Sequence, residues 1–177
     1  DYWTRVFRTN ATGTFLMLRA QLRYLVEQQR GGAIVNVASI AGMTGLSGNP
    51  AYVASKHAVN GLTRNAAVDY APYGIRVNSV NMAATDTPMI ARAGALVAAS
   101  MKAEDGPAMG RIKTNSILSY TATGHRPAAV EEQVGMMLFL LSGEASNVTS
   151  GPGVSGRLSK ALPMKGAKAR HASELPR

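Results

Sequence analysis

Residues 33–80 constrain the fold most, because they read as a strand, a helix and a second strand in succession. Residues 33–38 (Ala-Ile-Val-Asn-Val-Ala) and 75–80 (Ile-Arg-Val-Asn-Ser-Val) are short and rich in β-branched residues, which is typical of buried strands. Residues 51–71 between them have a helical pattern that ends at Pro72-Tyr73-Gly74. Two parallel strands joined by a helix form the crossover unit of α/β proteins. The sequence therefore predicts an α/β fold with a parallel sheet.

Helices are also predicted on both sides of this unit. In residues 2–29, apolar side chains recur mostly at three- and four-residue steps, and Gly31-Gly32 is expected to end the helix. Residues 127–142 begin with a proline and carry acidic residues in the first turns, which is typical of a helix start. Thr87-Pro88 could begin a further helix, whereas residues 106–124 read as a loop.

Composition excludes several classes of protein. The 177 residues suffice for one domain with a core. The absence of cysteine excludes disulfides and thiolate metal sites, and we expect no metal centre. No apolar stretch is long enough to span a bilayer, so no membrane partner is expected. The chain begins at Asp1 without a methionine or a signal-peptide pattern, which we interpret as a truncated cytoplasmic protein.

The net charge of +9 is concentrated at one end of the chain. Residues 157–177 carry six basic side chains and one acidic side chain. Such a tail can bind nucleic acid or an anionic membrane surface, or it can be a solvated disordered end. We predict a domain over residues 1–156 and a basic, disordered tail over residues 157–177, with no nucleic-acid partner.

Tyr52, Lys56 and Ser39 are the candidate chemical groups. On a helix, Tyr52 and Lys56 are one turn apart and share a face. A phenol alone is a poor acid or base at neutral pH, and a neighbouring ammonium stabilises its phenolate form. Ser39 follows a strand, where the crevice of an open α/β sheet lies, so its hydroxyl could hold a substrate oxygen during proton transfer. The alternative is an ordinary pair of neighbours on a helix face.

Six segments of the sequence form a recognisable series. They are Asn10-Ala-Thr-Gly13, Gly32-Ala-Ile-Val-Asn-Val-Ala-Ser39, Tyr52-Val-Ala-Ser-Lys-His-Ala58, Gly61-Leu-Thr-Arg64, Gly74-Ile-Arg-Val-Asn-Ser-Val80 and Thr87-Pro-Met89. Their order and spacing, over roughly residues 1–149, resemble those of the classical short-chain dehydrogenase/reductase family. The resemblance implies the C-terminal part of a Rossmann-like, doubly wound parallel sheet with helices on both faces.

The resemblance implies four catalytic residues. Tyr52 matches the general acid/base of the family, and Lys56 matches the residue that supports it and binds the nicotinamide ribose. Ser39 matches the group that orients the substrate carbonyl. Asn10 matches the helix residue whose backbone holds a proton-relay water. The implied reaction is reversible hydride transfer between NAD or NADP and a small-molecule carbonyl or secondary alcohol.

The resemblance also implies a cofactor site that includes Tyr52, Lys56, Ala83, Thr85 and Thr87. Thr87 matches the hydroxyl that holds the nicotinamide carboxamide, and Thr85 lies nearby in sequence. The family has Pro-Gly where this chain has Met82-Ala83, so the methyl group of Ala83 is expected to crowd the nicotinamide. The helices at residues 2–29 and 51–71 match those through which family members form homodimers or homotetramers.

The chain departs from the family at both ends. It has no glycine-rich strand-to-helix turn to bind pyrophosphate, and Val148-Thr149 leads into an unfamiliar tail. We therefore expect an exposed edge on the strand at residues 33–38, poor stability, and weak or absent dinucleotide binding by the isolated chain. The alternative function is a catalytically inactive fragment that serves as an oligomerisation or binding module.

Overall fold

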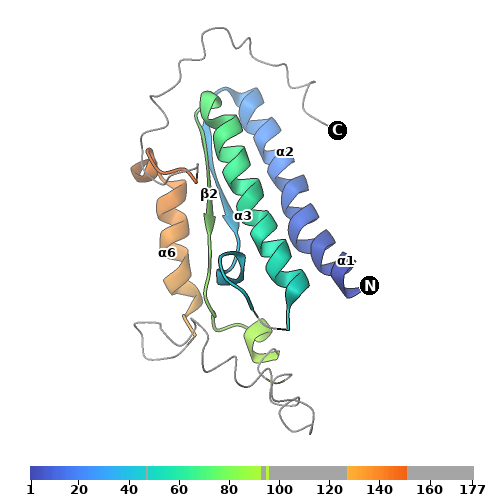
Figure 1. Ribbon diagram of the computed structural model, residues 1–177. Helices are drawn as coiled ribbons and strands as arrows, with labels where there is room; N and C mark the ends of the chain where they lie inside the picture. Colours follow the sequence, from blue (N-terminus) through green and yellow to red (C-terminus); the bar gives the residue numbers. More distant parts are fainter. Residues whose placement is uncertain (47, 93–94, 96–126, 151–177) are drawn as a thin grey trace, which may run out of the picture.

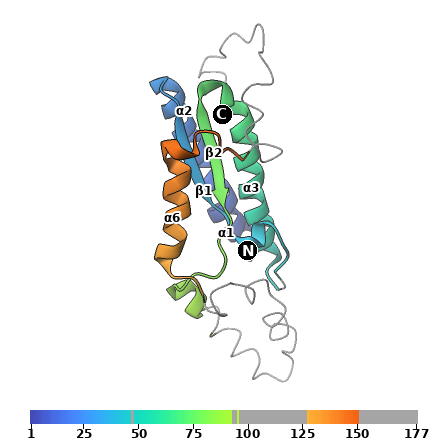
Figure 2. The ribbon, with the colours of Figure 1, turned by 90° about the vertical axis from the view of Figure 1, so that its left-hand side faces the viewer.

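The described elements form three layers, with helices on both faces of a two-stranded sheet (Figure 1). The computed structural model describes residues 1–46, 48–92, 95 and 127–150. Figure 2 views the sheet from the side of α6, with α2 and α3 on the far side. The predicted α/β fold is confirmed. The elements are α1 (Tyr2–Phe7), the π-helical turn η1 (Arg8–Thr12), α2 (Gly13–Gln28), β1 (Gly32–Val37), η2 (Ile40–Gly42), α3 (Pro50–Tyr70), η3 (Ala71–Tyr73), β2 (Ile75–Val80), α6 (Val130–Leu141) and η5 (Gly143–Ala145).

The two strands run parallel, and α3 connects them as predicted. Their register pairs Gly32 with Ile75 and continues to Val37 with Val80. Among the described residues, the other edge of β1 has no strand partner, and Val37 at its end is 50% exposed. The absence of a described strand on this side of β1 agrees with the expected open edge.

The core lies between the sheet and the layer formed by α2 and α3. Leu18 and Leu22 are one turn apart on α2, so they point to the same side and pack toward the sheet. Ala66 and Ala67 of α3 have small side chains, which let this helix approach the strands closely. The shared cluster consists of Leu18, Leu22, Ile34, Ala66, Ala67, Ile75 and Val77.

The N-terminal helix is continuous but contains one wide turn. The backbone is α-helical in α1 and α2 and π-helical over Arg8–Thr12. The predicted helix over residues 2–29 is thus confirmed, although Gln28 is its last helical residue. Gln29 adopts the left-handed conformation, with a φ of 53°, so the helix ends before the two glycines that were expected to end it.

α6 begins at Val130, three residues later than predicted. Ala128 is held instead in a parallel bridge with Thr85, in which its N–H donates to the Ala84 carbonyl oxygen at 2.9 Å. The carboxylate of Glu132 accepts a hydrogen bond from the N–H of Ala129, which fixes the helix start there. The prediction that Pro127 opens the helix was therefore wrong.

Arg76 of β2 connects the end of α6 to the sheet by hydrogen bonds. Its guanidinium donates to the carbonyl oxygens of Leu140 at 2.8 Å and Ser142 at 2.9 Å, at the C-terminus of α6. It also donates to the carbonyl oxygen of Val148 at 3.3 Å. A cation at a helix C-terminus is favoured by the helix dipole and by the unpaired carbonyl groups there. This contact holds α6 on the face of the sheet opposite α3.

Several predictions concern residues that the structure covers only in part. Residues 88–92 are helical, as the proline at position 88 suggested. The predicted loop at residues 106–124 and the predicted tail at residues 157–177 lie outside the described residues. Within the described part of the chain, no helix combines the length and the hydropathy that a membrane crossing requires.

Candidate active site

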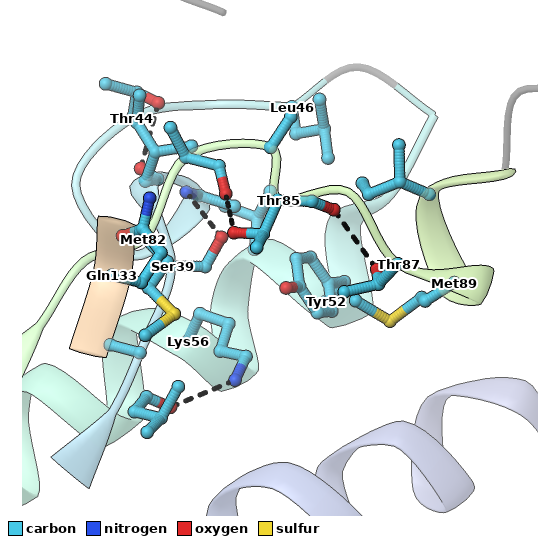
Figure 3. Close-up of a pocket in the computed structure, with 18 of the residues that line it drawn as sticks. Ser39, Thr44, Leu46, Tyr52, Lys56, Met82, Thr85, Thr87, Met89 and Gln133 are labelled. Carbon is cyan, nitrogen blue, oxygen red and sulfur yellow. Dashed lines mark hydrogen bonds between the residues drawn. The ribbon is translucent and has the colours of Figure 1, made fainter. Parts of the chain in front are cut away.

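A pocket of about 1210 Å³ lies where the chain leaves β1 and β2 (Figure 3). Its walls come from the loop after β1, the start of α3, the segment after β2 and one face of α6. In open parallel sheets, ligands bind at the carboxyl ends of the strands, which is where this pocket lies. Polar side chains facing it are Ser39, Thr44, Tyr52, Lys56, Thr85, Thr87 and Gln133.

Tyr52 and Lys56 enter the pocket from the first turns of α3. The helix begins at Pro50, whose fixed φ suits the first position of a helix. The Lys56 Nζ atom lies 5.8 Å from the centre of the Tyr52 ring, so the ammonium and the phenol are neighbours as predicted. Nζ also donates to the carbonyl oxygen of Val37 at 3.2 Å, and burial lowers the pKa of Lys56 below its ordinary value of 10.5.

Ser39 follows β1 and faces the same pocket. Its Oγ accepts a hydrogen bond from the N–H of Ala41 at 3.2 Å, which fixes the side chain at the start of η2. Its hydroxyl proton therefore remains available for an oxygen acceptor in the pocket. Figure 3 shows the hydroxyl end of Tyr52 directed toward the space bordered by Ser39 and Lys56. The structure thus brings together these three predicted groups.

Asn10 lies behind α3 and does not line the pocket. Its Nδ2 donates to Oγ of Ser55 at 3.0 Å, and that hydroxyl donates to the Tyr52 carbonyl oxygen at 2.8 Å. The backbone carbonyl of Asn10, which lies in the π-helical turn, accepts from the hydroxyl of Thr14 at 2.7 Å. Asn10 therefore contacts the helix that carries Tyr52 and Lys56. Unlike Ser39, it is not among the residues that line the pocket.

Ala83, Thr85 and Thr87 form the wall that leads away from β2. The Thr85 hydroxyl donates to the Ala83 carbonyl oxygen at 3.3 Å, and the Thr87 hydroxyl donates to the Thr85 carbonyl oxygen at 3.1 Å. Both hydroxyl oxygens keep lone pairs that can accept from an amide N–H₂. These hydroxyls and the Lys56 ammonium therefore suit the carboxamide and ribose of a nicotinamide nucleoside. Ala83 is only half-buried at the pocket wall.

One wall of the pocket was not predicted from the sequence. Val130, Gln133, Val134 and Met137 of α6 all face it. Their spacing of three, four and seven residues places them on one helical face, which is a signal that the sequence contained. Among the described residues, no cluster of His, Asp and Glu side chains could hold a metal ion.

Comparison with known proteins assigns the family. The sequence model of the family described as short chain dehydrogenase matches residues 1–96. A 3beta-hydroxysteroid dehydrogenase from Mediterraneibacter gnavus is 40% identical over 153 residues, which cover 84% of this chain and 55% of that protein. A 2,5-dichloro-2,5-cyclohexadiene-1,4-diol dehydrogenase from Sphingobium indicum is 50% identical over 84 residues, which cover 48% of this chain and 34% of that protein.

Solved structures agree with the sequence comparison. Carveol dehydrogenase from Mycobacterium avium, in complex with NAD, superposes with a TM-score of 0.71 and 28% identity over 84% of this chain and 53% of that chain. NAD⁺-bound xylitol dehydrogenase gives a TM-score of 0.68 and 30% identity over 84% and 56%. The chain spans about half the length of these structures and of the 3beta-hydroxysteroid dehydrogenase. It belongs to the short-chain dehydrogenase family.

Proposed function

We propose that this chain carries the proton-transfer site of an oxidoreductase that interconverts a secondary alcohol and a carbonyl compound with a nicotinamide dinucleotide. The observation that supports this most is the meeting of the Ser39 hydroxyl, the Tyr52 hydroxyl and the Lys56 ammonium at one pocket. The family assignment supports the same chemistry. A second candidate, an inactive oligomerisation or binding module, has no observation of comparable weight.

The dinucleotide, when bound, accepts or supplies a hydride at its nicotinamide ring. Tyr52 takes the hydroxyl proton of the alcohol during oxidation and returns a proton to the carbonyl oxygen during reduction. Lys56 stabilises the phenolate form of Tyr52 by its positive charge. Ser39 donates a hydrogen bond to the same substrate oxygen and fixes its position. Asn10 supports α3 through Ser55 and holds a water with its backbone carbonyl, as the family resemblance implies.

The described residues fit the nicotinamide end of the dinucleotide. Lys56 uses one of its three N–H groups on the Val37 carbonyl and so has donors left for ribose hydroxyls. Thr85 and Thr87 would offer acceptors for the carboxamide, and Ala83 lies on the same wall of the pocket. NAD is bound in the structures of the carveol and xylitol dehydrogenases, which favours NAD, and NADP is the alternative.

The substrate we propose is an apolar cyclic alcohol or ketone. Much of the pocket lining is apolar and includes Met82, Met89, Ile90 and the apolar side chains of α6. Such a lining favours a hydrocarbon ring over a highly hydroxylated molecule, because polar groups buried against it would lose hydrogen bonds to water. Relatives named for a hydroxysteroid and for a cyclohexadienediol agree with this choice.

We further propose that the protein assembles into a homodimer or homotetramer through its N-terminal helices and α3. Trp3, Phe15 and Met17 are 49%, 41% and 62% exposed on α1 and α2. Large apolar side chains that remain exposed on these helices favour a surface that a second copy covers.

The function is tested by the rate of NADH formation from NAD⁺ and a cyclic secondary alcohol. Tyr52→Phe removes the proton carrier and keeps the ring, so the rate should fall by about 10²–10⁴-fold. Tyr24→Phe is the matched control, because Tyr24 is 58% exposed on α2, remote from the pocket. Equal rates for the wild type and Tyr52→Phe would refute the proposal. An assembled protein with no turnover would favour the inactive module.

A further inference from the structure

Asn60 has a fully paired side chain in a buried position. It lies on α3 one turn after Lys56, it is 4% exposed, and it does not line the pocket. Its Nδ2 donates to the Gly42 carbonyl oxygen at 2.9 Å and to Oδ1 of Asn81 at 2.8 Å. Its Oδ1 accepts from the Ser79 hydroxyl at 2.9 Å. Both amide hydrogens and the amide oxygen are therefore used inside the protein.

The partners of Asn60 belong to two segments that pack against α3. Gly42 ends η2, the turn that starts at Ser39, and its N–H donates to the Ser39 carbonyl oxygen at 2.7 Å. Ser79 and Asn81 lie at the end of β2, immediately before the segment that carries Ala83, Thr85 and Thr87. One carboxamide thus links η2, α3 and the segment after β2.

The packing at this joint leaves little room for adjustment. A Cβ at Gly42 would lie 2.7 Å from Nδ2 of Asn60, 2.7 Å from the Lys56 carbonyl oxygen and 3.0 Å from the Lys56 carbonyl carbon. The turn after Ser39 therefore rests directly on the helix backbone beside Lys56. A buried hydrogen bond at such a contact fixes the relative position of two segments, because any shift leaves a polar group unpaired.

We propose that Asn60 is a positioning residue that sets the location of Ser39 relative to Tyr52 and Lys56 without touching the substrate. The proposal rests on the proposed function for its kinetic consequence. Without the carboxamide, the hydrogen bonds from the Asn60 side chain to η2 and to the segment after β2 are lost. Hydride and proton transfer need the reacting groups aligned within a fraction of an ångström, so a loosened Ser39 lowers the chemical rate more than it weakens binding.

The first test is amide hydrogen exchange in the purified chain, which needs neither cofactor nor turnover. Asn60→Ala should increase exchange at Ile40 and Gly42 by at least tenfold while the amides of the β1–β2 ladder keep their protection. The Ile40 amide reports directly, because it donates to the Met82 carbonyl oxygen at 2.9 Å. Asn65→Ala is the matched control, since Asn65 is exposed on the same helix and bonds Asp69. Unchanged exchange at Ile40 and Gly42, or an equal increase throughout the sheet, would overturn the proposal.

The second variant separates the three bonds of the carboxamide. Asn60→Asp keeps the side-chain shape, and both Ser79 and Asn81 can donate to a carboxylate, whereas the bond to the Gly42 carbonyl is lost. Exchange should therefore rise at η2 in this variant and change little after β2. An increase confined to residues after β2 would contradict the assigned role. This variant also decides the proposal if Asn60→Ala fails to fold.

The kinetic test follows where the wild type shows turnover. Asn60→Ala should lower kcat by at least tenfold with a change in KM below threefold, and Asn65→Ala should change neither. Accelerated exchange with an unchanged kcat would overturn the positioning role and leave the proposed function standing. Absence of turnover in the wild type would count against the proposed function alone, because the exchange experiment still decides whether Asn60 fixes η2.

Discussion

The contact between Gly42 and α3 allows a prediction of opposite stability changes for two glycine substitutions. Gly42→Ala would place a methyl group 2.7 Å from the Lys56 carbonyl oxygen, where 3.4–4 Å is ordinary van der Waals contact. The turn must move by several tenths of an ångström, and such overpacking costs about 1–3 kcal/mol of unfolding free energy. Gly61, in contrast, lies on the exposed side of α3, and a Cβ there meets nothing within 4 Å.

Gly61→Ala should stabilise the protein by about 0.8–1 kcal/mol, because alanine is the better helix former. The assay is urea unfolding followed by circular dichroism. The midpoints of both variants are compared with that of the wild type, provided that the unfolding free energy depends on urea concentration with the same slope in all three proteins. For a slope of about 2 kcal/mol/M, Gly42→Ala should lower the midpoint by about 0.5–1.5 M and Gly61→Ala should raise it by about 0.5 M. A midpoint for Gly42→Ala at or above that of the wild type would refute the packing argument.

Four further predictions follow from the structure. Arg76→Met should lower the unfolding free energy by about 1–3 kcal/mol in the same assay, because the carbonyl groups at the end of α6 lose a charged donor, and an unchanged midpoint would contradict this. Burial lowers the pKa of Lys56 in the folded protein below its ordinary value of 10.5. Between the folded-state pKa and 10.5, the unfolded chain therefore binds more protons than the folded protein, and the unfolding free energy of the wild type should rise as the pH increases toward 10.5. Lys56→Met should lack this rise, as unfolding midpoints across the alkaline range would show, whereas parallel curves would exclude the effect. Met17→Glu should shift the mass measured by light scattering toward the monomer if the N-terminal helices form an interface, and an unchanged mass would place the interface elsewhere. Titration of the 177-residue chain with NADH and with NADPH should give weak or no saturable binding, since the sequence has no glycine-rich turn for the pyrophosphate, and tight binding of either would contradict the expectation.

The elements governed by local patterns were predictable from the sequence. The strand at residues 75–80 has the predicted bounds, and β1 and α3 differ from prediction by one residue at each end. Tyr52 and Lys56 were placed correctly because helical spacing alone puts them on one face. Ser39 was placed correctly because a residue after a parallel strand must lie at the carboxyl edge of the sheet.

The features that depend on distant contacts were not predictable. α6 starts late because Ala128 pairs with Thr85, and that partner lies more than forty residues away in sequence. The π-helical turn around Asn10 has no pattern in the periodicity of the apolar residues. Nothing in the sequence distinguishes Asn60 from other polar residues of the helix, because its partners Gly42 and Asn81 are brought to it only by the packing of three segments. Non-local hydrogen bonds of this kind cannot be predicted from the spacing of residues in the sequence.

The central claim is that Tyr52 transfers the proton in an alcohol–carbonyl oxidoreductase. The most direct measurement is the rate of NADH formation with a cyclic secondary alcohol, in the chain and in any longer natural protein that contains it. NAD⁺ is supplied at millimolar concentration to compensate for the weak dinucleotide binding expected of the isolated chain. The account predicts a rate proportional to protein concentration that falls by about 10²–10⁴-fold in Tyr52→Phe and is retained in Tyr24→Phe. A Tyr52→Phe variant as active as the wild type, or a wild type without turnover in every form tested, would contradict it.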